Sequence, residues 1–485
     1  MNEQSRREFL KKLGSLGALA PVISVLNGCG GTGGLSKSKQ NRPNIILCMA
    51  DDHGWGDTGY NGHSFIHTPN LDRMAKEGIV FNRFYSGAPV CSPTRGSCIT
   101  GRHPYRYGVF SANVGHMPKE EITLAETLKT SGYTTGHFGK WHLGILTKSE
   151  IESNRGGREK QAEHYSPPWD NGFDVCFSTE AKVPTYDPMV TPQGRKGNNP
   201  NAGKPYGTYY WVGPGNKETE NLQGDDSRII MDRVIPFIEN AVKEKKPFFA
   251  VVWFHAPHLP VVAGAEHRAI YKDLTEYDQH YFGCITAMDE QVGRLRNELS
   301  KLGIEKNTML WYCSDNGPER GTPGSTGPFR ERKRSLYEGG VRVPGLLVWP
   351  QKIKTSRSVD IPCSTSDYFP TILDVLGFQM KGQPEPIDGT SLMPLIEGKM
   401  KQRVKPIGFE SQEWRIGKKF SLVDDRYKLI TNDDGQTYEL YDLINDMSET
   451  KNIASQKPAI VKVMKQTLER WRASCKRSLA GVDYK

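Results

Sequence analysis

Two short clusters of oxygen-bearing side chains could together hold a metal ion. Asp51-Asp52 follows an apolar run at residues 45–49, and Asp315-Asn316 follows a second run at residues 309–313. Ligand sets made only of oxygen atoms suit calcium or magnesium, whereas zinc prefers histidine and cysteine. A single Asp-Asn-Gly is ordinarily a turn or a helix cap. Because two such clusters each follow an apolar run, we expect a site for a hard cation.

A candidate nucleophile lies in the run Cys91-Ser92-Pro93-Thr94-Arg95. Pro93 suits the first turn of a helix, so the run predicts a helix from Cys91 to about Thr100. Cys91 would then lie at the positive end of the helix dipole, which attracts anions and stabilises a charged nucleophile. Two structural alternatives stay open, a disulfide with Cys98 and an ordinary buried thiol.

Basic and histidine side chains follow two further apolar runs. Lys140 and His142 come after residues 133–138, and His255 and His258 come after residues 248–254. In open α/β sheets, ligands bind outside the carboxyl ends of the strands. Four polar clusters at four such ends therefore predict one shared site.

Apolar runs of strand length alternate with helical patterns over residues 42–376. This alternation predicts an α/β domain with a mainly parallel sheet and helices on both faces. We expect one helix at residues 71–77, with Asn70 as its N-cap, and another around residues 287–302. Residues 149–225 are rich in Gly, Pro and Asn without clear periodicity, so we expect insertion loops over the site.

The pattern changes after Gly377, where short strand-like runs flank an Asp434-Gly435 turn. Such spacing predicts a small antiparallel unit. A helix is expected from about residue 459 to 474. We therefore expect residues 377–485 to form a smaller C-terminal α+β unit.

Composition and charge restrict the class of protein. The chain has 485 residues, 36% of them hydrophobic, which is enough for a large domain with a smaller one. The formal net charge of +9 suits a protein that handles anions. The basic residues are scattered, and neither a helix-turn-helix nor a zinc-finger spacing occurs, so we expect no nucleic-acid partner. No CxxC pair is present, which excludes a zinc knuckle.

The N-terminus has the pattern of an export signal. Arg6-Arg7 precedes a weakly apolar run at residues 13–26, which is too short and too broken for a membrane span. Residues 1–29 are expected to be a twin-arginine signal and residues 30–41 a flexible tether. Cys29 ends a candidate lipobox, with simple cleavage as the alternative. We expect an exported protein, periplasmic or lipid-anchored at the cell envelope, with no other membrane contact.

At this point the sequence resembles the sulfatase family. The C-x-P-x-R signature of that family is Cys91 to Arg95, and the resemblance runs from about residue 42 to the C-terminus. It implies an alkaline-phosphatase-like fold and the hydrolysis of sulfate esters. The other matching motifs are Thr68-Pro69-Asn70-Leu71-Asp72, Gly139-Lys140-Trp141-His142-Leu143-Gly144, Ala256-Pro257-His258, Ser314-Asp315-Asn316-Gly317 and Tyr337-Glu338-Gly339-Gly340-Val341-Arg342.

The resemblance also implies two non-protein components. A separate maturation enzyme would oxidise Cys91 to formylglycine, whose hydrate supplies the attacking oxygen. One calcium ion would draw charge from the sulfate oxygens. Its implied ligands are Asp51, Asp52, Cys91, Asp315 and Asn316.

The same resemblance assigns roles to the charged residues of the site. Arg95, Lys140 and Lys333 would place fixed positive charge around the sulfate. In proton transfer, Asp315 would deprotonate the nucleophile, His258 would protonate the departing oxygen, and His142 would help to release sulfate. His53 and His255 receive no role.

The substrate class is the least determined expectation. Export suggests sulfated carbohydrates, and the stretch from Thr326 to Tyr337 resembles the arylsulfatase and N-acetylgalactosamine-6-sulfatase branch. Specificity is expected to come from residues 149–225, 103–116 and 410–415. Two alternative functions are an alkaline-phosphatase-like phosphatase or phosphodiesterase with two zinc ions, and a binder of sulfated glycans without catalysis.

Overall fold

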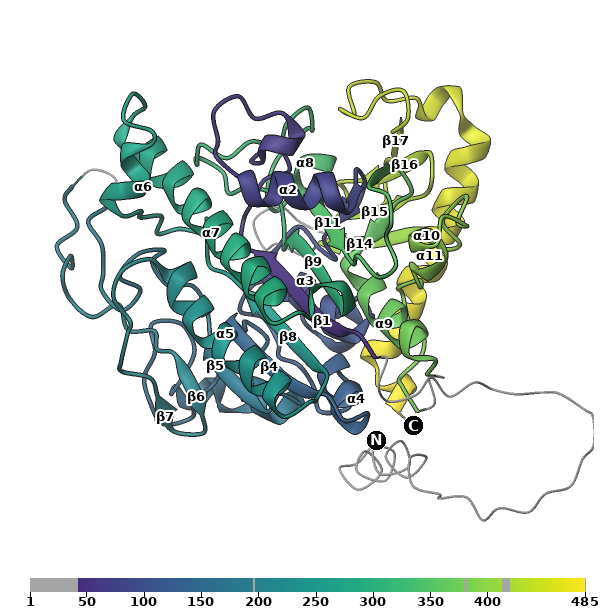
Figure 1. The fold of residues 1–485 in the computed structure, drawn as a ribbon. Helices are drawn as coiled ribbons and strands as arrows, with labels where there is room; N and C mark the ends of the chain where they lie inside the picture. The colour runs from purple at the N-terminus through teal and green to yellow at the C-terminus, as the bar shows by residue number, and fades with distance from the viewer. Residues whose placement is uncertain (1–41, 195–196, 379–381, 412–418, 485) are drawn as a thin grey trace, which may run out of the picture.

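Figure 1 shows a computed structural model of the chain, which describes residues 42–194, 197–378, 382–411 and 419–484. The expected twin-arginine signal, the tether and Cys29 lie outside the described residues. Within them, no helix has the length and apolar character that crossing a bilayer requires.

A ten-stranded sheet forms the centre of the molecule, in the order β12-β2-β11-β9-β1-β8-β4-β5-β6-β7. The neighbours β9, β1, β8 and β4 all run parallel to one another, so their carboxyl ends meet at one edge. The strands are β1 (Asn44–Ala50), β2 (Ile79–Phe81), β4 (Thr134–Lys140), β5 (Val175–Thr179), β6 (Trp211–Gly213), β7 (Asn216–Lys217), β8 (Phe248–Trp253), β9 (Thr308–Ser314), β11 (Gly345–Val348) and β12 (Arg357–Val359).

Helices cover both faces of this sheet (Figure 1). Alternate residues of β1 enter different cores because side chains alternate along a strand, Leu47 on one face and Ile46 on the other. Buried residues of α3, α4 and α9 share the core of Leu47, and those of α2, α5 and α7 share the core of Ile46. The helices are α2 (Pro69–Glu77), α3 (Cys91–Thr100), α4 (Leu124–Thr130), α5 (Asp226–Lys243), α6 (Ala265–Ala269), α7 (Glu276–Lys301), α8 (Glu338–Val341), α9 (Tyr368–Leu376), α10 (Met393–Ile396) and α11 (Pro458–Leu479).

A separate antiparallel sheet occupies the C-terminal part of the chain. Its order is β14-β15-β16-β17, and α11 packs Met464 and Leu468 against it. Its strands are β14 (Ile407–Ser411), β15 (Lys419–Val423), β16 (Tyr427–Thr431) and β17 (Glu439–Asp442); a third small sheet pairs β3 (Phe84–Tyr85) with β10 (Arg342–Val343) and β13 (Cys363–Ser364). The expected fold class is therefore confirmed, whereas the domain boundary at residue 376 stays a prediction.

Two local expectations were wrong, and one expected helix was too short. Thr68, not Asn70, is the N-cap of α2; Asn70 is the second residue of that helix, and its side chain donates to Asp289 at 2.8 Å. The helix expected around residues 287–302 is α7, which begins eleven residues earlier, at Glu276, where Thr275 caps it. Residues 149–225 are not only loops, because β5 extends the main sheet beside β4 and is followed by β6 and β7.

Candidate active site

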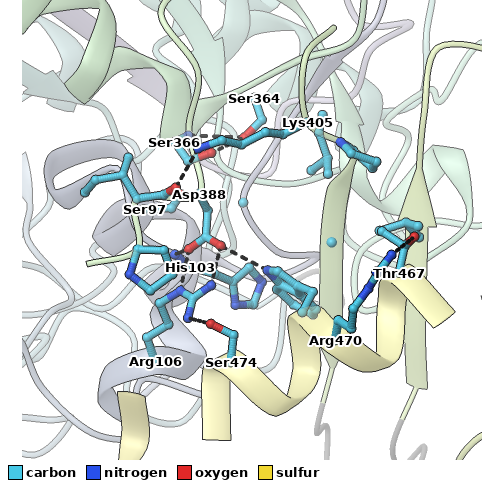
Figure 2. A pocket seen from close by; sticks show the side chains of 18 of the residues that line it. Ser97, His103, Arg106, Ser364, Ser366, Asp388, Lys405, Thr467, Arg470 and Ser474 are labelled. Atoms are coloured by element: carbon cyan, nitrogen blue, oxygen red, sulfur yellow. Dashed lines mark hydrogen bonds and ion pairs between the residues drawn. The ribbon is translucent and has the colours of Figure 1, made fainter. Parts of the chain in front are cut away.

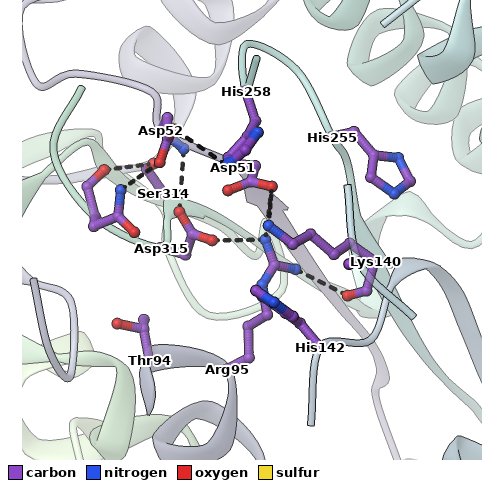
Figure 3. A network of polar contacts seen from close by, with 12 residues as sticks. Asp51, Asp52, Thr94, Arg95, Lys140, His142, His255, His258, Ser314 and Asp315 are labelled. Carbon is purple, nitrogen blue, oxygen red and sulfur yellow. Dashed lines mark hydrogen bonds and ion pairs between the residues drawn. The ribbon is translucent and has the colours of Figure 1, made fainter. Parts of the chain in front are cut away.

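The four polar clusters meet at the carboxyl edge of the central strands (Figure 3). Asp51 follows β1, Lys140 ends β4, His258 follows β8 and Asp315 follows β9. Backbone bonds hold the turns together: the Asp51 amide donates to Ala256 at 3.0 Å, and the Asp315 amide donates to the last residue of β1 at 3.1 Å. The parallel order of the strands is thus what brings residues 51 and 315 into one site.

Three buried oxygens at this edge have no hydrogen-bond partner: Oδ1 of Asp51, Oδ2 of Asp52 and Oδ1 of Asn316. Ligand atoms of Asp51, Cys91 and Asp315 lie within 4.8 Å of one another, and so do those of Asp51, Asp52 and His258. An unpaired buried oxygen is costly, on the order of 1–3 kcal/mol or more when charged. A cation bound among these oxygens would remove that cost, so the residues present fit a calcium site.

Three cations are paired with the carboxylates, and two of them, Lys140 and Arg95, are labelled in Figure 3. Lys140 Nζ lies 2.6 Å from Asp51 Oδ2, Lys333 Nζ lies 2.5 Å from Asp52 Oδ1, and Arg95 Nη2 lies 2.6 Å from Asp315 Oδ2. All of these side chains are at most 2% exposed. Buried charges survive only when paired in this way. The resulting site has fixed positive charge beside its carboxylates.

Burial and neighbouring charge act in opposite directions on these groups. Burial raises the pKa of Asp51, but the charges of Lys140 and Arg95 outweigh it, so the pKa lies well below its ordinary value. Burial and the Asp51 charge together raise the pKa of Asp315. Burial alone would lower the pKa of Lys333, but the charge of Asp52 raises it, so Lys333 stays charged.

Cys91 is the first residue of α3, directly after the N-cap residue Val90, and is 2% exposed. Burial raises the pKa of its thiol, although Lys140 and Lys333 act against it. An unmodified Cys91 is therefore a poor thiolate nucleophile near neutral pH. Cys91 and Cys98 are both free, so the disulfide between them is wrong.

Two histidines border the cluster. The ring of His258 donates from Nδ1 to Leu259 O at 2.6 Å, while its Nε2 lies 3.7 Å from Asp52 Oδ2. His142 Nε2 lies 2.8 Å from Oδ1 of Asn113, and its Nδ1 is buried without a partner. Burial lowers the pKa of both rings well below the ordinary value, so both are neutral in the free protein.

The two histidines without an assigned role are held by other groups. His53 bonds Tyr312 Oη and Asp57 O, each at 2.7 Å. His255 bonds Asp226 Oδ2 and Thr179 Oγ1, each at 2.8 Å. Both ring nitrogens of each histidine are thus hydrogen-bonded to groups outside the polar cluster, which gives His53 and His255 a structural role.

A separate cavity of about 330 Å³ lies between α11, β14 and the far end of α3 (Figure 2). Ser97, His103 and Trp471 are among the residues that line it, and none of the cluster residues does. Its buried Arg106 is already paired with Asp388 at 2.7 Å. This cavity is therefore distinct from the polar cluster.

The segments expected to govern specificity have different outcomes. Within residues 103–116, His103 lines the separate cavity, but Asn113 bonds His142. Residues 412–418 lie outside the described residues. Asn113 and Glu180, which both contact the His142 region, were not found from the sequence, because neither belongs to a recognisable motif.

A cluster of buried carboxylates beside Cys91 and the N-terminus of α3, at the carboxyl edge of an α/β sheet, fits the class of hydrolases with an alkaline-phosphatase-like fold. The sulfatase family profile matches residues 43–378, and the chain belongs to this family. It is thus an enzyme that hydrolyses sulfate esters. A second profile, N-sulphoglucosamine sulphohydrolase, C-terminal, matches residues 326–474.

Three relatives of this chain are named as sulfatases. N-acetylgalactosamine-6-sulfatase of Mus musculus is 33% identical over 383 residues, which cover 74% of this chain and 68% of that protein. The Homo sapiens protein of that name is 33% identical over 388 residues, covering 74% and 67%. Steryl-sulfatase of Rattus norvegicus is 31% identical over 419 residues, covering 73% and 70%. The matched part thus spans about two thirds of these relatives.

Solved structures agree with the fold. Ps i-CgsB has a TM-score of 0.77 and 27% identity, with 91% of this chain and 97% of that chain covered. The phosphonate monoester hydrolase of Agrobacterium radiobacter has a TM-score of 0.62 at 20% identity, covering 90% and 97%, which shows a shared fold alone. The fold therefore hosts more than one chemistry, and the family match decides between them.

Proposed function

We propose that this sulfatase removes sulfate from sulfated glycans, with Cys91 converted to formylglycine and one calcium ion in its site. The observation that carries the proposal is the group of unpartnered buried oxygens on Asp51, Asp52 and Asn316, beside Cys91. Asp51, Asp52, Asp315, Asn316 and residue 91 would hold the ion. When bound, calcium supplies Lewis-acid polarisation of the sulfate oxygens.

The raised pKa of the Cys91 thiol argues against an unmodified thiolate as the nucleophile near neutral pH. A cysteine thiol that attacked sulfur would also carry no hydroxyl on the same carbon with which to expel the sulfate. Formylglycine in its hydrated form supplies two hydroxyls on one carbon, so one can attack and the other can restore the carbonyl. The proposal therefore includes a maturation enzyme as a partner of this chain.

The charged residues of the site have proposed roles in binding and proton transfer. Lys140, Lys333 and Arg95 bind and orient the sulfate, because they are buried, charged and preorganised. Asp315 accepts the proton of the nucleophile, which its raised pKa favours. His258 donates a proton from Nε2 to the departing oxygen; the approach of an anionic sulfate ester raises its pKa and so couples protonation to binding.

The glycan substrate class rests on the names of relatives. Several are N-acetylgalactosamine-6-sulfatases, and Ps i-CgsB has been solved in complex with k-i-k-neocarrahexaose, in a structure 27% identical with a TM-score of 0.76. The test is a panel of sulfated monosaccharides, sulfated oligosaccharides, a steryl sulfate and a nitrophenyl phosphate. We expect the highest kcat/KM on a sulfated saccharide. A preference for the steryl sulfate would overturn the glycan class, and one for the phosphate would favour a phosphatase.

Export by the twin-arginine route is part of the proposal and rests on Arg6-Arg7 and the apolar run after them. Replacing both arginines with lysine is expected to retain the precursor in the cytoplasm. Fractionation of cells that make either form measures this. Unimpaired export of the double variant would contradict the route.

A further inference from the structure

A short chain of hydrogen bonds leads away from the polar cluster through His142. Its Nε2 lies 2.8 Å from Asn113 Oδ1, and its buried Nδ1 has no partner. Both residues have left-handed backbone conformations, with φ of 57° at His142 and 63° at Asn113. Such conformations cost on the order of 1–3 kcal/mol and persist where the surrounding structure enforces them. The surrounding structure therefore holds both residues of the His142–Asn113 contact in position.

Glu180, at the other end of this series of hydrogen bonds, determines which atom donates in each of them. Its carboxylate accepts from the backbone amide of Arg155 at 3.1 Å and from that of Gly156 at 2.8 Å. Asn154 must therefore turn its amide nitrogen toward Glu180, and the Nδ2 to Oε1 distance is 2.9 Å. A carboxylate can only accept, so the orientation of the Asn154 amide follows from it.

That orientation is passed on to His142. The same Nδ2 of Asn154 lies 2.7 Å from the Asn113 side chain, so the Asn113 atom at this contact must be its amide oxygen. An amide oxygen accepts and cannot donate. The Nε2 of His142, which faces the same oxygen, must then carry the ring proton, and Nδ1 keeps its lone pair.

Glu180 is buried, and a guanidinium lies beside its carboxylate. Arg155 Nε is 3.5 Å from Glu180 Oε1. With two backbone amides and this guanidinium directed at it, the Glu180 carboxylate is the acceptor in these contacts.

We propose that Asn113 is a positioning residue that, with Asn154 and Glu180, holds His142 in the tautomer with its proton on Nε2. The Nδ1 lone pair is then available to accept a proton from a hydroxyl group at residue 91. This inference rests on the proposed function for the role of His142, but the tautomer itself follows from the contacts. Figure 3 shows His142 beside Arg95, and the charges of Lys140 and Arg95 both act on its ring.

The direct test is the tautomer of His142, read by nitrogen NMR of the full chain labelled with 15N-histidine. His142→Gln identifies the signals of this ring. We expect a protonated Nε2 and an unprotonated Nδ1 in the wild type. Asn113→Asp, whose carboxylate also accepts, should keep this tautomer, whereas Asn113→Ala should give a mixture. A protonated Nδ1 in the wild type, or an unchanged tautomer in Asn113→Ala, would overturn the proposal.

Kinetics supply the second test. Removing the partner that orients a metal-bound histidine typically lowers activity by about 10- to 100-fold, and we expect the same range for the partner of His142. We expect a loss of that size in kcat for Asn113→Ala, with KM little changed, and a smaller loss for Asn113→Asp. Asn297→Ala, at an exposed position of α7, is the matched control. Equal kcat in Asn113→Ala and the wild type would contradict a positioning role.

The two tests also separate this inference from the proposed function. The tautomer of His142 is also measured in the Cys91→Ala variant, because the NMR measurement does not require an active enzyme. If the wild type fails to hydrolyse any sulfate ester, the proposed function falls while the NMR result still decides the role of Asn113. If the enzyme is active and the tautomer is the opposite one, only this inference falls.

Discussion

The guanidinium of Arg95 lies 2.6 Å from Oδ2 of Asp315, and both side chains are fully buried. The same guanidinium nitrogen lies 3.6 Å from Asp51 Oδ2, so one cation bridges carboxylates that follow two different strands. Asp315 in turn accepts from the backbone amide of Asp52 at 3.1 Å. The ion pairs and this hydrogen bond fix the orientation of the two carboxylates, which would lower the cost of binding a cation between them.

Calcium should bind to this site and stabilise the fold. A ligand at a free concentration of 100 times its Kd adds about 2.7 kcal/mol to the free energy of unfolding. We expect the thermal midpoint to rise when calcium is added to chelated protein, and elemental analysis to give one calcium per chain. Asp51→Ala and Asp315→Ala should abolish both the rise and the activity.

The exposed Asp273 provides the control for these variants. Asp273→Ala should keep the calcium response and the activity. Active protein that contained zinc and no hard cation would contradict the calcium site and favour a phosphatase-like centre.

The proposed acid role of His258 predicts a dependence on the leaving group. A sugar alkoxide is strongly basic and needs a proton, whereas nitrophenolate leaves without help. A positioned acid is worth about a hundred- to ten-thousand-fold. His258→Ala should therefore lose far more kcat/KM on a carbohydrate sulfate than on nitrophenyl sulfate. His67→Ala, at an exposed position, should change neither rate.

Equal losses on the two substrates would make His258 a sulfate-binding residue rather than an acid. Both rates are to be measured on the same preparation, so that the fraction of converted Cys91 cancels.

A buried ion triad joins the C-terminal sheet to the catalytic part of the chain. Lys428 Nζ on β16 lies 2.9 Å from Glu338 Oε1 and 3.0 Å from Glu449 Oε1, with all three side chains fully buried. Removing one partner of a buried pair typically costs 3–5 kcal/mol, since an uncompensated charge is left behind. Lys428→Met should therefore lower the thermal midpoint clearly.

Glu338 also pairs with Arg342 at 3.3 Å, so the charge that Lys428→Met leaves without a partner is that of Glu449. The double variant Lys428→Met with Glu449→Gln should recover part of the lost stability in thermal unfolding. A single variant as stable as the wild type, or a double variant less stable than the single one, would contradict the triad's role in joining the two parts.

Much of the scaffold could be predicted because its signals are local. The apolar run before Asp51 is strand β1, and the helix expected from Cys91 to about Thr100 is α3. Polar residues at the ends of β1, β4, β8 and β9 converge because parallel strands place their carboxyl ends together. These features follow from periodicity and turn chemistry alone.

The remaining features depend on contacts distant in sequence. The N-cap of α2 is Thr68, and the Asn70 side chain instead donates a hydrogen bond to Asp289, more than two hundred positions away in the sequence. Strand β5 has a weak apolar pattern and is stabilised by pairing with β4. Asn113 and Glu180 gain their significance only from neighbours in space, such as His142 and Asn154. No short-range pattern could identify them.

The central claim is that residue 91 acts as formylglycine. Peptide mass spectrometry on preparations made with and without a maturation enzyme gives the fraction of aldehyde or diol at residue 91, and sulfatase assays give the specific activity of each. We predict that activity rises in proportion to that fraction and is absent in Cys91→Ala. Full activity in protein whose Cys91 thiol is intact would contradict the claim.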